Sequence, residues 1–77
     1  MDDKSILDHV GELMAEEHRL RDEAAPSAQT HERIRDIAEQ LDQCWDLLRQ
    51  RRARREFGED PEAAQVRDVK TVEGYIG

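Results

Sequence analysis

Residues 34–48 have the sequence IRDIAEQLDQCWDLL, and this stretch decides the fold. Its apolar residues are separated by alternating steps of three and four, at Ile34, Ile37, Leu41, Cys44 and Leu48. That spacing is the heptad pattern of an amphipathic helix that packs against another helix. No glycine or proline occurs between Ser27 and Phe57, and Gly58 follows as a helix-ending residue. The pattern therefore predicts one long helix over about residues 28–57.

A second helical stripe precedes it, at Ile6, Val10, Leu13 and Leu20, with Glu17 at the step where an apolar residue is missing. This spacing predicts a helix over about residues 3–25. Ser5 and Asp8 have the form of a capping box, and Asp2 and Asp3 are alternative N-caps. Pro26 disfavours a helical residue before it, and Ser27 or Thr30 can cap the next helix.

The two stripes match each other in an antiparallel arrangement. In an antiparallel hairpin the residue numbers of facing pairs have a nearly constant sum. That sum is 54 for Leu13 with Leu41, Val10 with Cys44, Ile6 with Leu48, and Glu17 with Ile37. Half of 54 falls at the Pro26–Ser27 break, so the pairing and the turn signal agree. The predicted fold class is all-α, an antiparallel two-helix hairpin.

Residues 58–77 have a different character. Asp60 followed by Pro61 is typical of the start of a short helical turn. The apolar residues Val66, Val69, Val72 and Tyr75 are spaced by three and are too sparse to form an independent core. We therefore expect a helical hairpin over residues 1–57 and a largely irregular C-terminal tail over residues 58–77.

The composition limits what such a chain can do. Only 15 of the 77 residues are Ile, Leu, Val or Phe, 40% are charged, and the net charge is -7. A core this small disfavours a large enclosed active site, and no apolar run approaches the ~18 residues of a membrane span. The acidic N-terminus lacks the apolar region of a signal peptide, and the single Cys44 cannot form an intramolecular disulfide. We therefore expect a cytoplasmic protein.

The apolar residues that flank the two stripes indicate a further contact. Leu7, Met14, Trp45 and Leu47 lie beside the stripes and supply a second interface. Two hairpins packed face to face would form a helical bundle and compensate for the small core. The sequence therefore predicts a homo-oligomer with coiled-coil-like packing, and a dimer is favoured.

Four segments of the chain resemble a known family. They are residues 1–7 (MDDKSIL), residues 41–54 (LDQCWDLLRQRRAR), and residues 57–61 (FGEDP) with residues 71–75 (TVEGY). They are similar to a family of short, uncharacterised actinobacterial proteins known as domain of unknown function 2630. The resemblance covers most of the chain and implies a small bacterial protein. It implies no activity, because the family has none assigned.

Five arginines near the end of the second helix form the most distinctive charged feature, at Arg49, Arg51, Arg52, Arg54 and Arg55. One interpretation is contact with nucleic-acid phosphates or an acidic protein. The favoured alternative is pairing within the protein or between subunits, because the sum of 54 brings Asp2 and Asp3 beside Arg51 and Arg52. Exposed pairs of this kind contribute little, so we expect replacing Arg51 and Arg52 to cost little stability. The candidate partner-binding residues are Trp45, the five arginines and Tyr75.

The sequence contains no pattern that favours catalysis. The histidines at 9, 18 and 31 lack metal-site spacing, and Cys44 on an apolar stripe is typical of a small buried residue. Glu17 interrupts the stripe and is expected to fix the register or reach an arginine. We therefore expect no catalytic, cofactor-binding or metal-binding residues and no enzyme activity. The leading hypothesis is a protein–protein interaction or self-associating module. The alternative is a nucleic-acid-associated regulatory protein that uses residues 49–55.

Overall fold

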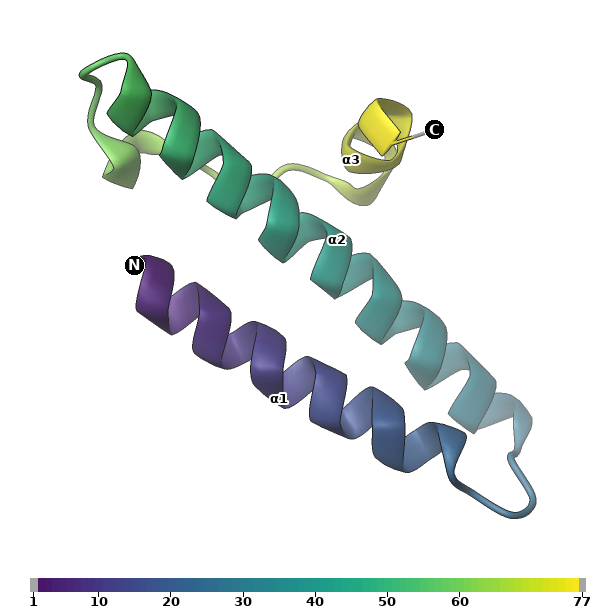
Figure 1. Cartoon of the computed structure of the whole chain (residues 1–77). Helices are drawn as coiled ribbons and strands as arrows, with labels where there is room; N and C mark the ends of the chain where they lie inside the picture. The colour runs from purple at the N-terminus through teal and green to yellow at the C-terminus, as the bar shows by residue number, and fades with distance from the viewer. Residues whose placement is uncertain (1, 77) are drawn as a thin grey trace.

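A computed structural model of the chain describes the backbone of residues 2–76 and the side chains of residues 2–73. Within these residues the elements are α1 (Asp3–Arg21), α2 (Ala28–Glu56), the short 3-10 helix η1 (Pro61–Ala63) and α3 (Val69–Ile76). α1 and α2 run antiparallel and side by side, and the C-terminal segment folds back along the other side of α2 (Figure 1). The predicted all-α hairpin is confirmed.

The start of α1 is set by Asp2, whose carboxylate accepts a hydrogen bond from the backbone N–H of Ser5 at 2.8 Å. This N-cap selects the Asp2 alternative over the Ser5–Asp8 capping box. α1 ends at Arg21, four residues before the expected end at 25. Asp22 is the C-cap, and in the turn that follows the Glu23 carboxylate accepts a hydrogen bond from the Thr30 hydroxyl at 2.9 Å.

The ends of α2 follow the sequence signals. The Ser27 hydroxyl accepts a hydrogen bond from the backbone N–H of Thr30 at 3.2 Å, so Ser27 is the N-cap. At the other end Phe57 is the C-cap, and Gly58 has a φ of 70°. That left-handed conformation is the one a glycine adopts without steric cost, so Gly58 ends the helix as expected.

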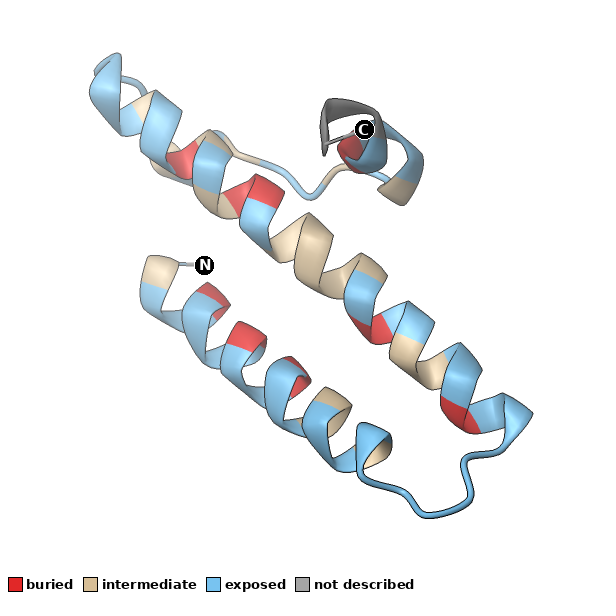
Figure 2. Cartoon of the chain, turned by 45° about the vertical axis from the view of Figure 1, so that its right-hand side comes forward, coloured by how far each residue is buried: buried red, intermediate tan, exposed pale blue. Residues whose placement is uncertain are grey.

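The core is a narrow line between the two long helices, visible along their facing sides in Figure 2. Ile6, Val10 and Leu13 of α1 are 3–4% exposed, and Ile37 of α2 is fully buried. The register agrees with the predicted sum of 54, because Asp3 forms an ion pair with Arg51 at 2.6 Å.

On α2 the buried leucine differs from the expected one. Leu47 is 5% exposed, whereas Leu48 and Leu41 are only half-buried. The expectation that Leu47 supplies a second interface is therefore wrong. The physical reason is the C-terminal tail, which covers the side of α2 that carries Leu47.

The tail is irregular between short helical elements. η1 confirms the predicted turn, and its N-cap Asp60 accepts a hydrogen bond from the backbone N–H of Glu62 at 3.0 Å. α3 was not expected from the sparse valines. It forms because Asp68 accepts a hydrogen bond from the Thr71 N–H at 2.8 Å, and because Val72 is fully buried. An eight-residue helix is marginal alone, so its packing against α2 supplies the stability.

The molecule is a single layer of helices. Its Cα extents are 50 × 25 × 14 Å, and its radius of gyration is 14.5 Å. A compact chain of this length would have a radius of gyration of about 11.5 Å. The accessible surface is 5575 Å², whereas a compact monomer of this mass exposes about 4,900 Å². The chain is therefore more extended than a compact domain of its size and exposes more surface to solvent.

Candidate functional site

The arginines at the end of α2 are paired with carboxylates inside the folded chain. Each of the five has a carboxylate oxygen within 3.9 Å. The pairs are Arg49 with Asp46, Arg51 with Asp3 and Glu62, Arg52 with Glu56, Arg54 with Glu59, and Arg55 with Asp3. The prediction of pairing within the protein is confirmed.

Arg51 differs from its neighbours because its side chain is only 7% exposed. Its guanidinium donates to Asp3 Oδ1 at 2.6 Å, to Glu62 Oε1 at 3.2 Å and to the Pro61 carbonyl at 3.3 Å. It thereby joins the start of α1, the end of α2 and η1. Hydrogen bonds from Arg55 and Arg51 hold the pKa of the Asp3 carboxyl below its usual range.

Two details of the predicted arginine pairing are wrong. Asp2 caps α1, and Arg52 pairs with Glu56 one turn along its own helix at 3.1 Å. Arg51 is also not the exposed pair that the sequence suggested, because its side chain is only 7% exposed. Its three hydrogen bonds reach α1 and η1, so replacing it would break the contact that joins α1, α2 and η1.

A polar cluster that was not predicted from the sequence lies on the side of α2 that meets the tail. Asp46 is 4% exposed and accepts a hydrogen bond from Gln50 Nε2 at 2.9 Å, and its carboxylate lies 3.4 Å from Arg67 Nε. Gln50 also donates to the Gln65 carbonyl at 2.7 Å, and Gln43 donates to the Arg67 carbonyl at 3.2 Å. These contacts fasten the tail to α2. The Asp46–Gln50 part of the cluster could have been predicted from the sequence, because residues four apart lie on one face of a helix.

Trp45 lies on an exposed apolar surface made by both long helices. Leu7 is 50% exposed, Met14 is 53% exposed and Trp45 is 42% exposed. Each follows an inward-facing residue by one position, so each is turned about 100° from the contact line of its helix. In an antiparallel pair that turn leads to the same side of both helices. We name this surface, formed by Leu7, Met14 and Trp45, the Trp45 face.

The other broad side of the hairpin carries different chemistry. Glu16 and Arg33 form a two-pronged ion pair across the helices, with N–O distances of 2.6 and 2.8 Å. The hydrogen bond from Arg33 holds the pKa of Glu16 below its usual range. This contact lies near the turn, and a cavity lies on the same side toward the other end of the hairpin.

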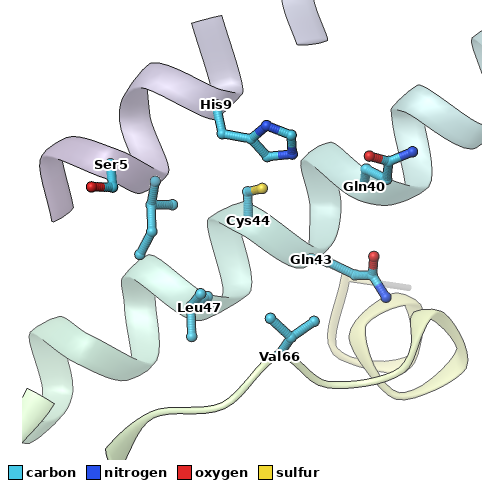
Figure 3. Close-up of a pocket in the computed structure, with 8 residues that line it drawn as sticks. Ser5, His9, Gln40, Gln43, Cys44, Leu47 and Val66 are labelled. Carbon is cyan, nitrogen blue, oxygen red and sulfur yellow. The ribbon is translucent and has the colours of Figure 1, made fainter. Parts of the chain in front are cut away.

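The cavity has a volume of about 260 Å³ and lies where α1, α2 and the tail meet. Figure 3 shows His9 extending from α1 toward Cys44 and Gln40 of α2, while Val66 points from the tail toward α2. Its lining residues are Ser5, Ile6, His9, Gln40, Gln43, Cys44, Leu47 and Val66. Burial raises the pKa of the Cys44 thiol, which keeps it protonated at neutral pH.

The remaining candidate groups are scattered over the surface. Glu17 lies 3.6 Å from Arg21, which agrees with the expectation that it reaches an arginine. His18 lies 3.6 Å from Asp22 in an exposed position. Among the described residues no three His, Cys, Asp or Glu side chains are grouped to hold a metal ion. The side chain of Tyr75 lies outside the described part of the chain.

The helices also bear on the question of membranes. Among the residues described, none of the helices combines the length and the apolar character that crossing a membrane would require.

Comparison with known proteins gives one family. Residues 2–77 match the family described as "Protein of unknown function (DUF2630)". The chain is also 46% identical to the uncharacterized proteins Rv0898c of Mycobacterium tuberculosis and Mb0922c of Mycobacterium bovis. Each alignment covers 97% of this chain and 91% of the relative. No solved structure shows a significant match to the chain.

Proposed function

Because the chain belongs to the DUF2630 family, a family of unknown function, we propose a role from its geometry: a non-catalytic helical module that dimerises through the Trp45 face. The observation that carries the proposal is the single-layer shape with this apolar face left uncovered. Stable domains are built from two packed layers, since one layer buries only one line of side chains. A second copy supplies the second layer.

The accessible surface area of the chain also supports a dimer. The chain exposes about 700 Å² more than a compact monomer of its mass. A standard interface buries about 800 Å² on each partner. A twofold contact through Leu7, Met14 and Trp45 uses the same patch on both copies, as in most homodimers. Trp45 is the expected anchor, because tryptophan is enriched among the residues that dominate interface energies.

Charge determines how this association responds to salt. Each chain carries a net charge of -7, so two copies repel each other at low ionic strength. Added salt screens this repulsion and leaves the apolar contact, so we expect the dimer to tighten. Binding to nucleic acid would weaken with salt, because phosphate contacts release counterions. The sign of the salt effect therefore separates the two functions.

The alternative nucleic-acid role has less support. The arginines it would use are paired with Asp3, Asp46, Glu56, Glu59 and Glu62, and binding phosphate would require those pairs to break. The non-catalytic part of the proposal is supported by the protonated Cys44 thiol, which is a poor nucleophile.

Sedimentation or light scattering on the full chain tests the proposal. We expect a mass near twice 9.0 kDa at micromolar concentration, and a blue-shifted emission of the single Trp45 as concentration rises. Trp45→Gln should weaken dimerisation at least tenfold. The matched control is Phe57→Ala, because Phe57 is 80% exposed at the far end of α2 and away from the Trp45 face. A folded wild-type chain that stays monomeric, or equal effects of both variants, would contradict the proposal.

A further inference from the structure

The cavity between α1, α2 and the tail has an apolar floor. Ile6 is 3% exposed and Leu47 is 5% exposed, and both line it. Cys44 also lines the cavity and is half-buried. The floor therefore consists of aliphatic and sulfur groups that gain from contact with an apolar molecule.

Val66 lines the cavity from the tail, and it belongs to the irregular segment of residues 64–68, which we name the strap. Gln50 donates a hydrogen bond to the carbonyl of Gln65, and Gln43 donates one to the carbonyl of Arg67. Val66 lies between these two anchors and lines the cavity, although it is 58% exposed. The hydrogen bonds from Gln50 and Gln43 thus hold the side chain of Val66 beside the cavity. About half of that side chain remains exposed to solvent.

The lining excludes charged side chains. Charged residues make up 40% of the chain, yet among the residues that the structure describes no Asp, Glu, Lys or Arg lines this cavity. Its polar groups are the hydroxyl of Ser5, the imidazole of His9 and the amides of Gln40 and Gln43. An ionic molecule would lose hydration here without gaining a counter-ion, which is costly. A neutral molecule would pair one polar group with the rim and place the rest on the floor.

The volume sets the size of that molecule. An apolar cavity of about 150 Å³ accepts benzene, and sites for larger ligands start at about 300 Å³. At about 260 Å³ this cavity suits one or two fused rings.

We propose that the cavity is a binding site for a neutral, mostly apolar small molecule with one hydrogen-bonding group, and that Val66 of the strap forms its closing wall. The site lies on the side of the hairpin opposite the Trp45 face. Occupation would also strengthen the attachment of the tail, because the ligand would contact both α2 and the strap.

A titration of the full chain with indole tests the proposal, read out by NMR at the methyl groups of Ile6, Leu47 and Val66. We expect saturable shifts at these methyls. Indole-3-acetate is the matched charged probe, and it should bind at least tenfold more weakly because no Lys or Arg is present among the described lining residues to pair with its carboxylate. Absence of saturable shifts with millimolar indole, or equal binding of the two probes, would overturn the proposal.

Two variants separate this site from the dimer interface. Val66→Ala removes part of the wall, and we expect indole binding to weaken about three- to tenfold. Leu7→Ala is the control, because it truncates a similarly exposed aliphatic residue on the Trp45 face and should weaken only dimerisation. Both residues are at least half exposed, so both variants should fold. Equal indole binding by Val66→Ala and the wild type would overturn the role of the strap. Indole affinity that falls as protein concentration rises would show that a second copy occupies the cavity, and would overturn the site itself.

Discussion

The two regions packed against α2 are held there by different kinds of contact. α1 lies on one side and contributes a row of three buried residues, Ile6, Val10 and Leu13. The tail lies on the other side, where Val72 is fully buried among its described residues and its backbone accepts hydrogen bonds from Gln43 and Gln50 of α2. The hairpin is thus stabilised mainly by apolar burial, whereas the tail is held by the packing of Val72 and a few hydrogen bonds. We therefore expect the tail to detach without unfolding the hairpin.

The largest effect in this comparison is expected from Ile37→Ala. Ile37 is fully buried opposite α1, and its truncation leaves a cavity in the narrow core of the hairpin. The loss should be about 2–5 kcal/mol in the free energy of unfolding. A domain of this size has a total stability on the order of 4–12 kcal/mol, so the hairpin should unfold at a clearly lower urea concentration at fixed protein concentration, and the tail loses its docking surface when α2 unfolds.

Leu41→Ala is the matched control for Ile37→Ala. Leu41 belongs to the same apolar stripe but is only half-buried, so its truncation should cost clearly less. If both variants lost the same free energy of unfolding, Leu41 would be as deeply buried between α1 and α2 as Ile37. The register described above would then be wrong.

The second largest effect is expected from Val72→Ala, and it should be local. α3 has eight residues and is marginal without packing, so losing part of the fully buried Val72 side chain should release it from α2. We expect a cost of about 1–2 kcal/mol for docking the tail. Hydrogen exchange should show faster exchange in residues 69–73 and unchanged protection around Ile37.

The half-buried Val69 provides the control, since Val69→Ala should release α3 less than Val72→Ala does. A comparable loss of protection in α1 and α2 would contradict the independence of the two regions. It would show that the tail is part of one cooperative unit with the hairpin.

The different contacts of the hairpin and the tail explain why the sequence predicted the hairpin but not the side of α2 that the tail covers. The heptad stripe, the Pro26 break and the Ser27 cap are local or periodic signals, and together they predicted the hairpin and the Asp3–Arg51 contact. A periodic signal does not show which side of a helix a later segment will cover. For that reason Leu47 was expected at an interface, although the tail covers it.

The tail and the cavity depend on contacts between residues far apart in the chain. Gln43 meets the Arg67 carbonyl across 24 residues, and Arg51 meets Asp3 across 48. Only the second pair follows from helix register. The first pair depends on where an irregular segment folds back, and that is set by Val72 packing and by hydrogen bonds without periodicity. The cavity beside the strap could not be predicted for the same reason.

The smallest expected effects come from two carboxylates, Glu16 in the hairpin and Asp68 in the tail. The pKa of Glu16 is lowered by the hydrogen bond from Arg33, and the pKa of Asp68 is lowered by the backbone hydrogen bond from Thr71. In the unfolded chain both groups titrate near pH 4. Their contribution is therefore fully present above about pH 4 and is lost as the pH falls through the lower folded-state pKa values.

Comparing Glu16→Gln with Asp68→Asn at several pH values and salt concentrations separates the two regions. At pH 7 both variants should be less stable than the wild type, and both differences should shrink toward pH 2, where the wild-type carboxyls are protonated. At pH 7 added salt should reduce the Glu16 difference, because it screens the attraction to Arg33. The Asp68 difference should change less, because its partner is a neutral N–H group. Urea midpoints measure the Glu16 effect, and hydrogen exchange in residues 69–73 measures the Asp68 effect. A Glu16 difference that persists in high salt would mean that hydrogen-bond geometry, and not charge, holds the two helices together near the turn.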